Sequence, residues 1–141
     1  MAIKKTAQQL VLDAENDIRT LAVLEAIQLL ESDDHVFVDL RDVRELEHEG
    51  IVPEAFHAPR GMIEFWVCPD SPYHKEIFSS GKTFVFYCRS GWRSALATKA
   101  IQDMGLENVC HIHGGFNAWK EVGGPIIKHK VNDKKKDGKK S

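Results

Sequence analysis

Two uninterrupted apolar segments stand out in the pattern of hydrophobic and polar positions along the chain. They occupy residues 36–38 and 84–87, and both are rich in β-branched and aromatic side chains. Unbroken apolar runs of this length are typical of strands buried on both faces, as in a parallel sheet covered by helices. We therefore predict strands over 35–40, 83–87 and 108–112, an edge strand over 18–21, and one short strand beside the loop 51–59.

Segments with helical spacing alternate with these strands. Thr6 is placed to cap the first helix and Gly50 to end a later one. In the second helix, Leu24, Ile27 and Leu30 would share one apolar face. Strands that alternate with helices indicate an α/β fold with a mainly parallel sheet flanked by helices on both faces. The predicted helices cover residues 7–16, 23–30, 43–48, 61–66, 73–78, 92–104 and 116–122.

A cysteine-containing loop follows the strand predicted at 83–87. Residues 88–94, which we call the thiol loop, are Cys-Arg-Ser-Gly-Trp-Arg-Ser, and good helix formers come directly after them. The free amides at the start of that helix, the helix dipole and the two arginines all favour an anion beside Cys88. We therefore expect the Cys88 sulfur to ionise readily and to tolerate negative charge next to it.

Polar residues also gather at the end of the strand predicted at 35–40. In open α/β sheets, functional groups collect at the carboxyl edge of the strands. Asp39 and Arg41 would therefore either reach the site or form an ion pair that supports the thiol loop, and we favour the ion pair. Arg60 and Trp66 complete the set of supporting candidates.

Composition and charge narrow the class of protein. The chain of 141 residues is 43% hydrophobic and 28% charged, which fits one globular domain. No apolar run is long enough to span a membrane, residues 1–20 lack a signal peptide's apolar region, and three cysteines form no disulfide framework. We therefore expect a cytoplasmic protein with no membrane partner.

The net charge of −2 is unevenly distributed. Residues 128–141 hold seven lysines and two aspartates, so the rest of the chain carries about −7. An acidic body argues against a nucleic-acid partner, and a lysine-rich end of this composition is typical of a solvated, disordered tail. We divide the chain into a helical extension (1–17), one domain (18–127) and this tail (128–141).

Three groups of residues resemble the rhodanese-domain family. Residues 38–41 with Glu45, Gly50, 52–53 and Ala55 are similar to its opening pattern, although Ile51 and Glu54 stand where the family often has His and Gly. Cys88 with Arg93 and Ser94 resembles its active-site loop. Residues 114–119 with 124–125 resemble its C-terminal signature. The resemblance covers about residues 20–127 and implies a three-layer rhodanese-like fold.

The resemblance also implies a sulfurtransferase that carries sulfur as a persulfide on Cys88. The donor would be thiosulfate or a similar small anion, the acceptor cyanide, a thiol or a protein thiol, and no separate cofactor or metal would be needed. Arg89 and Arg93 would steer a dianion, and Gly91 would let the backbone approach closely. Ser90 and Ser94 would donate hydrogen bonds, and Trp92 would form an apolar wall or pack against Phe65 or Trp66.

Other interpretations remain open at this point. Phosphatases and arsenate reductases have a Cys-x5-Arg loop, whereas four residues separate Cys88 from Arg93, which favours a cradle for one sulfur atom over one for phosphate. A rhodanese-fold interaction module without turnover, or a sulfur relay between proteins, is the main alternative. His111 and His113 alternate on a strand and suggest a metal site only weakly, and the chain would be a monomer or a homodimer.

Overall fold

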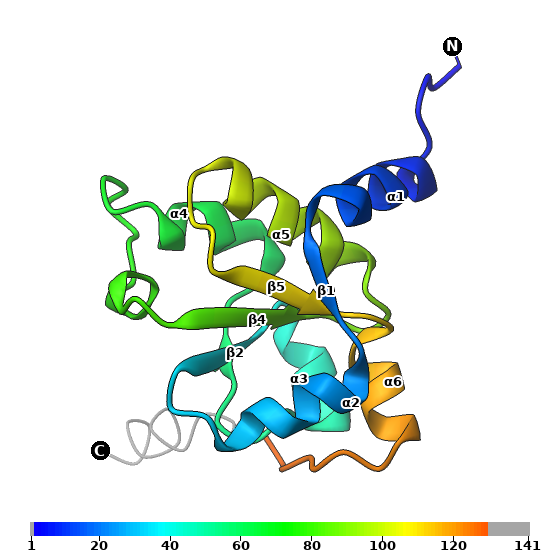
Figure 1. The fold of residues 1–141 in the computed structure, drawn as a ribbon, viewed down its shortest axis with the longest axis vertical. Helices are drawn as coiled ribbons and strands as arrows, with labels where there is room; N and C mark the ends of the chain where they lie inside the picture. The colour runs from blue at the N-terminus through cyan, green and yellow to red at the C-terminus, as the bar shows by residue number, and fades with distance from the viewer. Residues whose placement is uncertain (1, 130–141) are drawn as a thin grey trace, which may run out of the picture.

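A five-stranded parallel sheet forms the centre of the computed structural model, which describes residues 2–129. The strand order is β1-β5-β4-β2-β3, and every neighbouring pair of strands runs parallel (Figure 1). β4 therefore lies in the middle of the sheet, and its carboxyl end leads into the thiol loop. The strands are β1 (Arg19–Leu21), β2 (His35–Asp39), β3 (Phe56–His57), β4 (Thr83–Tyr87) and β5 (Val109–Ile112).

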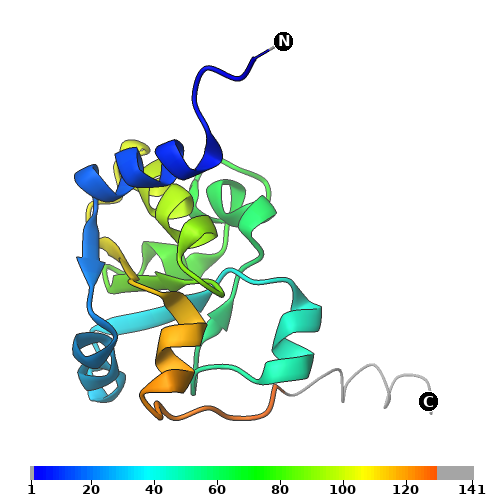
Figure 2. The same ribbon diagram turned by 90° about the vertical axis from the view of Figure 1, so that its right-hand side faces the viewer.

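Helices cover both faces of the sheet, as the alternating pattern predicts. Figures 1 and 2 show α1, α4 and α5 on one face and α2, α3 and α6 on the other. The α/β three-layer prediction is confirmed. The helices are α1 (Ala7–Asp17), α2 (Val23–Gln28), α3 (Val43–Glu49), α4 (Ile63–Val67), α5 (Trp92–Asp103) and α6 (Gly115–Glu121), with 3-10 turns η1 (Leu29–Glu31), η2 (Arg60–Met62) and η3 (Glu76–Ser79).

Alternate side chains of β4 enter two separate hydrophobic cores. Phe84 and Phe86 pack in the core that includes Ile101 of α5, whereas Val85 and Tyr87 pack in the core that includes Trp119 of α6. Successive side chains of a strand point to opposite faces, so one apolar strand serves both cores. The carboxyl end of β4 is thereby fixed from both sides, directly before Cys88.

Two local predictions differ from the structure. The second helix ends at Gln28, and Leu24 is 63% exposed while Ala26 is fully buried. The small Ala26 side chain lets α2 pack closely on the core, which turns Leu24 toward solvent. The helix predicted over 73–78 is reduced to η3, because the His74 ring instead joins the Trp66 carbonyl to the Ser79 hydroxyl across this segment.

Glu54, which stands where the resembled family often has glycine, has a backbone conformation that glycine favours. Glu54 has a φ of 63°, and it is the sole non-glycine residue with positive φ within residues 2–129. This left-handed conformation is the one that glycine adopts without strain. Nearby, Ile51 forms an antiparallel bridge with Ile127, which joins the domain's final residues to this segment.

Two sequence predictions concern the ends of the chain and its environment. Most of the predicted lysine-rich tail falls on residues 130–141, outside the described residues. Among residues 2–129, no helix has the length and apolar character needed to cross a membrane.

Candidate functional site

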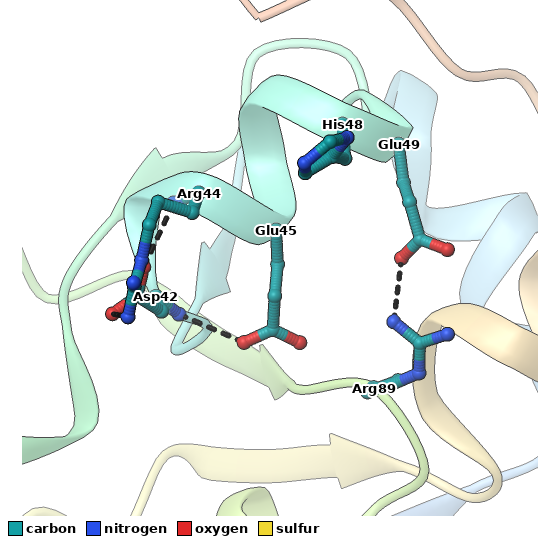
Figure 3. A pocket seen from close by; sticks show the side chains of 6 residues that line it. All are labelled: Asp42, Arg44, Glu45, His48, Glu49 and Arg89. Carbon is teal, nitrogen blue, oxygen red and sulfur yellow. Dashed lines mark hydrogen bonds and ion pairs between the residues drawn. The ribbon is translucent and has the colours of Figure 1, made fainter.

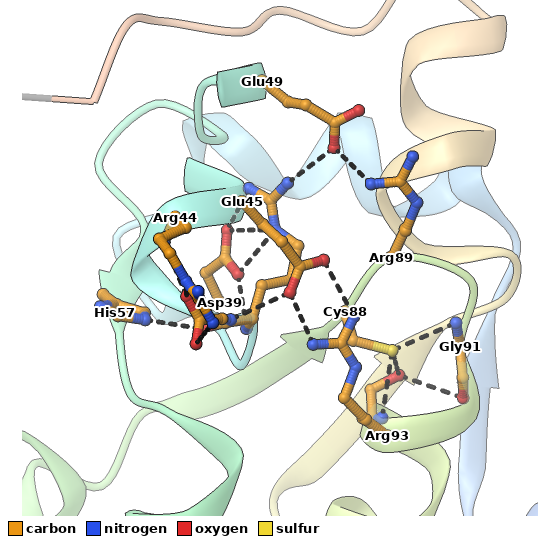
Figure 4. A network of polar contacts seen from close by, with 12 residues as sticks. Asp39, Arg44, Glu45, Glu49, His57, Cys88, Arg89, Gly91 and Arg93 are labelled. Carbon is orange, nitrogen blue, oxygen red and sulfur yellow. Dashed lines mark hydrogen bonds and ion pairs between the residues drawn. The ribbon is translucent and has the colours of Figure 1, made fainter. Parts of the chain in front are cut away.

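The sulfur of Cys88 is held at the start of α5 by backbone amides. Sγ accepts hydrogen bonds from the amides of Gly91 at 3.2 Å and Ser94 at 3.3 Å (Figure 4). Gly91 precedes the helix with a φ of 104°, which bends the loop back over the sulfur. The Cys88 residue is only 1% exposed, so its sulfur faces these amides rather than bulk water. Such an environment stabilises negative charge on sulfur.

The hydroxyl of Ser94 links this sulfur to a buried histidine. Ser94 Oγ lies 3.6 Å from Cys88 Sγ, 3.3 Å from the Gly91 carbonyl oxygen and 2.9 Å from Nδ1 of His111 on β5. Ser94 and His111 are both fully buried. The prediction that Ser94 donates to the site gains a partner here that the sequence did not reveal.

Helix α6 supports the thiol loop from the opposite side. The Phe116 amide donates to the Cys88 carbonyl at 2.8 Å, and the Asn117 amide donates to the Arg89 carbonyl at 3.0 Å. Gly115 has a φ of 58°, and a Cβ there would collide with the Cys88 carbonyl oxygen. The loop is therefore positioned by the first amides of two helices, one set on the sulfur and the other on the backbone carbonyls.

Both arginines of the thiol loop are paired with carboxylates of α3. Arg93 forms a two-point contact with Glu45 at 2.8 and 3.0 Å, and Arg89 contacts Glu49 at 3.0 Å (Figure 4). The hydrogen bonds from Arg93 lower the pKa of Glu45, and the same contact raises the pKa of Arg93. A substrate anion would therefore compete with an existing partner at each guanidinium.

A cavity of about 690 Å³ lies beside these pairs (Figure 3). Acidic and basic side chains alternate around it, so the cavity is polar without a strong excess of either charge. We call it the mouth cavity, and it is lined by Asp42, Arg44, Glu45, His48, Glu49 and Arg89.

Asp39 and Arg41 form the ion pair that we favoured from the sequence. Arg41 donates to the Asp39 carboxylate at 2.7–3.2 Å through two nitrogens and also donates to the Gly50 carbonyl at 2.7 Å. Both side chains are fully buried, and the guanidinium lies 4.0 Å from the centre of the Phe116 ring. The pair thus connects the ends of β2 and α3 with α6, behind the thiol loop.

The remaining sequence candidates have other surroundings. Arg60 pairs with Glu64 at 3.0 Å, while Trp66 packs edge-on against Phe56 in the core next to α4. Both residues thus have partners away from the thiol loop. Ser90 and Trp92 are exposed at the loop surface, the indole residue by 50%. Half of Trp92 is thus open to solvent, and Trp92 is not among the residues that line the mouth cavity.

The alternating histidines of the third strand are separated by their burial. His111 is inside the molecule, whereas His113 lies beyond the end of β5 and is exposed. Within residues 2–129, no group of three or more His, Cys, Asp and Glu side chains is arranged to hold a metal ion. Burial, and secondarily His113, lowers the pKa of His111 to about 4, so His111 is neutral at physiological pH.

Comparison with known proteins decides the family. The model of the rhodanese-like domain matches residues 22–122, which includes β2, the thiol loop and all of α6. The chain belongs to the rhodanese-like domain family. The match begins after α1, so the α1 helix lies outside the part of this rhodanese-like domain that defines the family.

Individual relatives of the rhodanese-like domain differ in their descriptions. An uncharacterized protein of Synechocystis sp. is 32% identical over 111 residues, 79% of this chain, and the chain spans 57% of that protein's length. A sulfurtransferase of Allochromatium vinosum is 30% identical over 100 residues, 71% of this chain and 85% of the relative. A Rhodopseudomonas palustris protein of unknown function, described as a possible tyrosine phosphatase, is 50% identical over 90% of this chain and 98% of its own, with a TM-score of 0.87.

Proposed function

We propose that this protein is a sulfurtransferase that carries a sulfane sulfur as a persulfide on Cys88. The observation that carries the proposal is the cysteine sulfur itself, buried at the start of α5 with two backbone amides directed at it. Family membership and the sulfurtransferase of Allochromatium vinosum support the same chemistry. The protein would thereby divide the transfer into two displacements through a covalent intermediate.

Both displacements balance without an added cofactor. In the first, the Cys88 thiolate attacks the outer sulfur of thiosulfate, the S–S bond of the donor breaks, and sulfite leaves with the bonding electron pair. In the second, cyanide or a thiolate attacks the sulfane sulfur, and the Cys88 thiolate leaves. The amides of Gly91 and Ser94 stabilise the thiolate before the first step and after the second.

The donor has to fit a mouth in which each loop arginine already has a carboxylate partner. Thiosulfate carries two negative charges and would have to compete with Glu45 for Arg93 and with Glu49 for Arg89. We propose that the donor is a small sulfane-sulfur anion, such as thiosulfate or polysulfide, that has to overcome this competition.

A phosphatase reaction is the competing activity, because the Rhodopseudomonas palustris protein is described as a possible tyrosine phosphatase. Phosphoryl transfer needs a loop whose amides surround three phosphate oxygens and whose arginine is available to them. Here two amides are directed at the sulfur itself, and Arg93 is paired with Glu45. These contacts favour sulfur transfer.

The test is to incubate the reduced protein with thiosulfate or polysulfide and to measure its intact mass. We expect one added sulfur atom, its removal by cyanide or a thiol, and no addition to the Cys88→Ser variant. Cys68→Ser is the matched control, because Cys68 is partly exposed outside the thiol loop and its variant should load like the wild type. Hydrolysis of p-nitrophenyl phosphate without any persulfide would contradict the proposal and favour the phosphatase.

A further inference from the structure

A line of polar groups runs from the buried Cys88 sulfur to the surface at α1. From Sγ it passes to Ser94 Oγ at 3.6 Å and from there to His111 Nδ1 at 2.9 Å. On the far side of the ring, His111 Nε2 lies 3.8 Å from a carboxylate oxygen of Glu15. The Glu15 side chain is 29% exposed, so the line ends in contact with water.

Helix α1 is held in place for this contact. Val11 and Ala14 of α1 are buried against Ala95 of α5, which fixes the face of α1 that carries Glu15. A hydrogen bond from the Gln102 side chain to the Asp17 carbonyl at 2.8 Å secures the end of the same helix. The α1 helix, although outside the family match, is thus an integral neighbour of the cysteine site.

We propose that Ser94, His111 and Glu15 form a proton relay for Cys88 whose hydrogen bonds reverse when the cysteine sulfur becomes anionic. His111 and Glu15 are positioning residues in this proposal, because they act on the sulfur through the Ser94 hydroxyl. The proposal rests on the proposed function only in taking Cys88 as the reactive group.

With Cys88 as a thiol, every hydrogen in the line points toward the surface. The S–H donates to Ser94 Oγ, the Ser94 hydroxyl donates to His111 Nδ1, and the Nε2–H of His111 is directed at Glu15. A movement of the Glu15 side chain by about 0.9 Å would bring it from the observed 3.8 Å to ordinary hydrogen-bond distance. A partly exposed glutamate side chain can make such a movement by rotamer adjustment.

With Cys88 as an anion, every hydrogen points toward the sulfur. The Ser94 hydroxyl donates to Sγ, the Nδ1–H of His111 donates to Ser94 Oγ, and Nε2 carries no proton. The balance is a net loss of one proton: the S–H hydrogen moves to Ser94 Oγ, the Ser94 hydrogen moves to His111 Nδ1, and the Nε2 hydrogen leaves through Glu15 to water. The anionic sulfur then has three donors, the two backbone amides and the hydroxyl.

The burial of His111 supports an exchange of tautomers instead of a charged ring. Within residues 2–129, Nε2 has no hydrogen-bond partner, which fits the unprotonated Nε2 of the anion state, whereas the Nε2–H of the thiol state needs the movement of Glu15. Burial lowers the pKa of His111 to about 4, so an imidazolium inside the relay is unfavourable. Gain of a proton at Nδ1 has to accompany loss of one at Nε2.

Nitrogen-15 NMR of labelled histidine measures the tautomer of His111 directly, and two variants fix the state of residue 88. Cys88→Ser has a hydroxyl that stays protonated, and Cys88→Asp has a permanent anion among the same amides. We expect His111 to be mainly protonated at Nε2 in Cys88→Ser and mainly at Nδ1 in Cys88→Asp. The same tautomer in both variants, each confirmed as folded by its amide spectrum, would overturn the relay.

Glu15 is tested in the Cys88→Ser background. Glu15→Leu removes the acceptor for Nε2–H, so we expect His111 to shift toward the Nδ1–H tautomer. Asp13→Leu is the matched control, because Asp13 lies on the same helix and pairs with Lys5 at 2.8 Å. An unchanged tautomer in Glu15→Leu, or an equal shift in the Asp13 control, would exclude Glu15 from the relay.

The wild-type protein separates this proposal from the proposed function. When Cys88 is loaded with sulfur from polysulfide, Sγ has no proton to donate, and His111 should adopt the Nδ1–H tautomer. A loaded protein with Nε2–H would contradict the relay alone. A protein that never loads contradicts sulfur transfer alone, because the comparison of Ser and Asp at position 88 still decides the relay.

Discussion

The buried His111 should make the stability of the protein fall as the pH decreases from 7 to 4. Its pKa is lowered from 6.5 to about 4 in the folded protein, first by burial and then by His113. Between pH 6.5 and about 4, His111 therefore binds a proton in the unfolded chain but stays neutral in the folded protein. Stability from this residue is fully present above pH 6.5 and is lost as the pH falls toward 4.

The magnitude follows from the two pKa values. Each pKa unit corresponds to about 1.4 kcal/mol. Relative to neutral pH, the lowered pKa of His111 therefore reduces the unfolding free energy by about 2 kcal/mol at pH 5 and about 3 kcal/mol at pH 4. Full burial of the ring makes solvent screening small at this site. A loss of this size is a substantial fraction of the unfolding free energy of a typical domain, about 5–15 kcal/mol.

Urea unfolding at pH 7.5, 6.5, 5.5 and 4.5 measures the effect, with the wild type compared with His111→Asn. Asparagine does not titrate, so its variant should lose less stability between the highest and lowest pH, whatever its stability at pH 7.5. His48→Asn is the matched control, because His48 is exposed and its variant should follow the wild-type curve. Parallel curves for wild type and His111→Asn would refute the reasoning.

Two further predictions concern the mouth and the loop. Glu45→Gln should release Arg93 and lower the KM for thiosulfate about fivefold, because a partly exposed ion pair contributes up to about 1 kcal/mol. Steady-state assays measure this KM, and Glu47→Gln on the same helix should leave it unchanged. Gly115→Ala should lower the unfolding free energy by about 3 kcal/mol in urea unfolding and abolish sulfur loading. Gly123 also has a positive φ, but no atom lies near its new Cβ, so Gly123→Ala should lower the unfolding free energy by about 1 kcal/mol and the variant should load sulfur normally. Equal losses in the two variants would contradict the proposed collision at Gly115.

The sequence predicts most of the fold because its signals are local. The apolar runs at β2 and β4 and the helical spacing of α5 each lie within one short segment, and the elements appear where these patterns place them. The face of α2 is not predicted correctly, because burial of Ala26 depends on how closely the helix approaches a core built by distant residues.

The candidate site likewise has a part that the sequence predicts and a part that only the structure shows. The thiol loop is recognisable because strand, turn and helix are contiguous around Cys88. The partners of its groups come from far along the chain: Glu45 lies 48 positions from Arg93, and His111 lies 17 positions from Ser94. Sequence patterns show that such residues are polar, and only tertiary structure shows which of them meet.

The support that α6 gives the thiol loop has a consequence for how the protein is made. The amino end of a nascent chain leaves the ribosome first, so Cys88 and α5 emerge before Phe116 and Asn117. The amides of these two residues hold the Cys88 and Arg89 carbonyls. Until that last helix forms, the nascent chain has the reactive cysteine but lacks half of the contacts that shape its loop. Acquisition of a competent sulfur site is therefore among the final events of synthesis, and a chain truncated before α6 would carry its thiol without the means to protect or direct it.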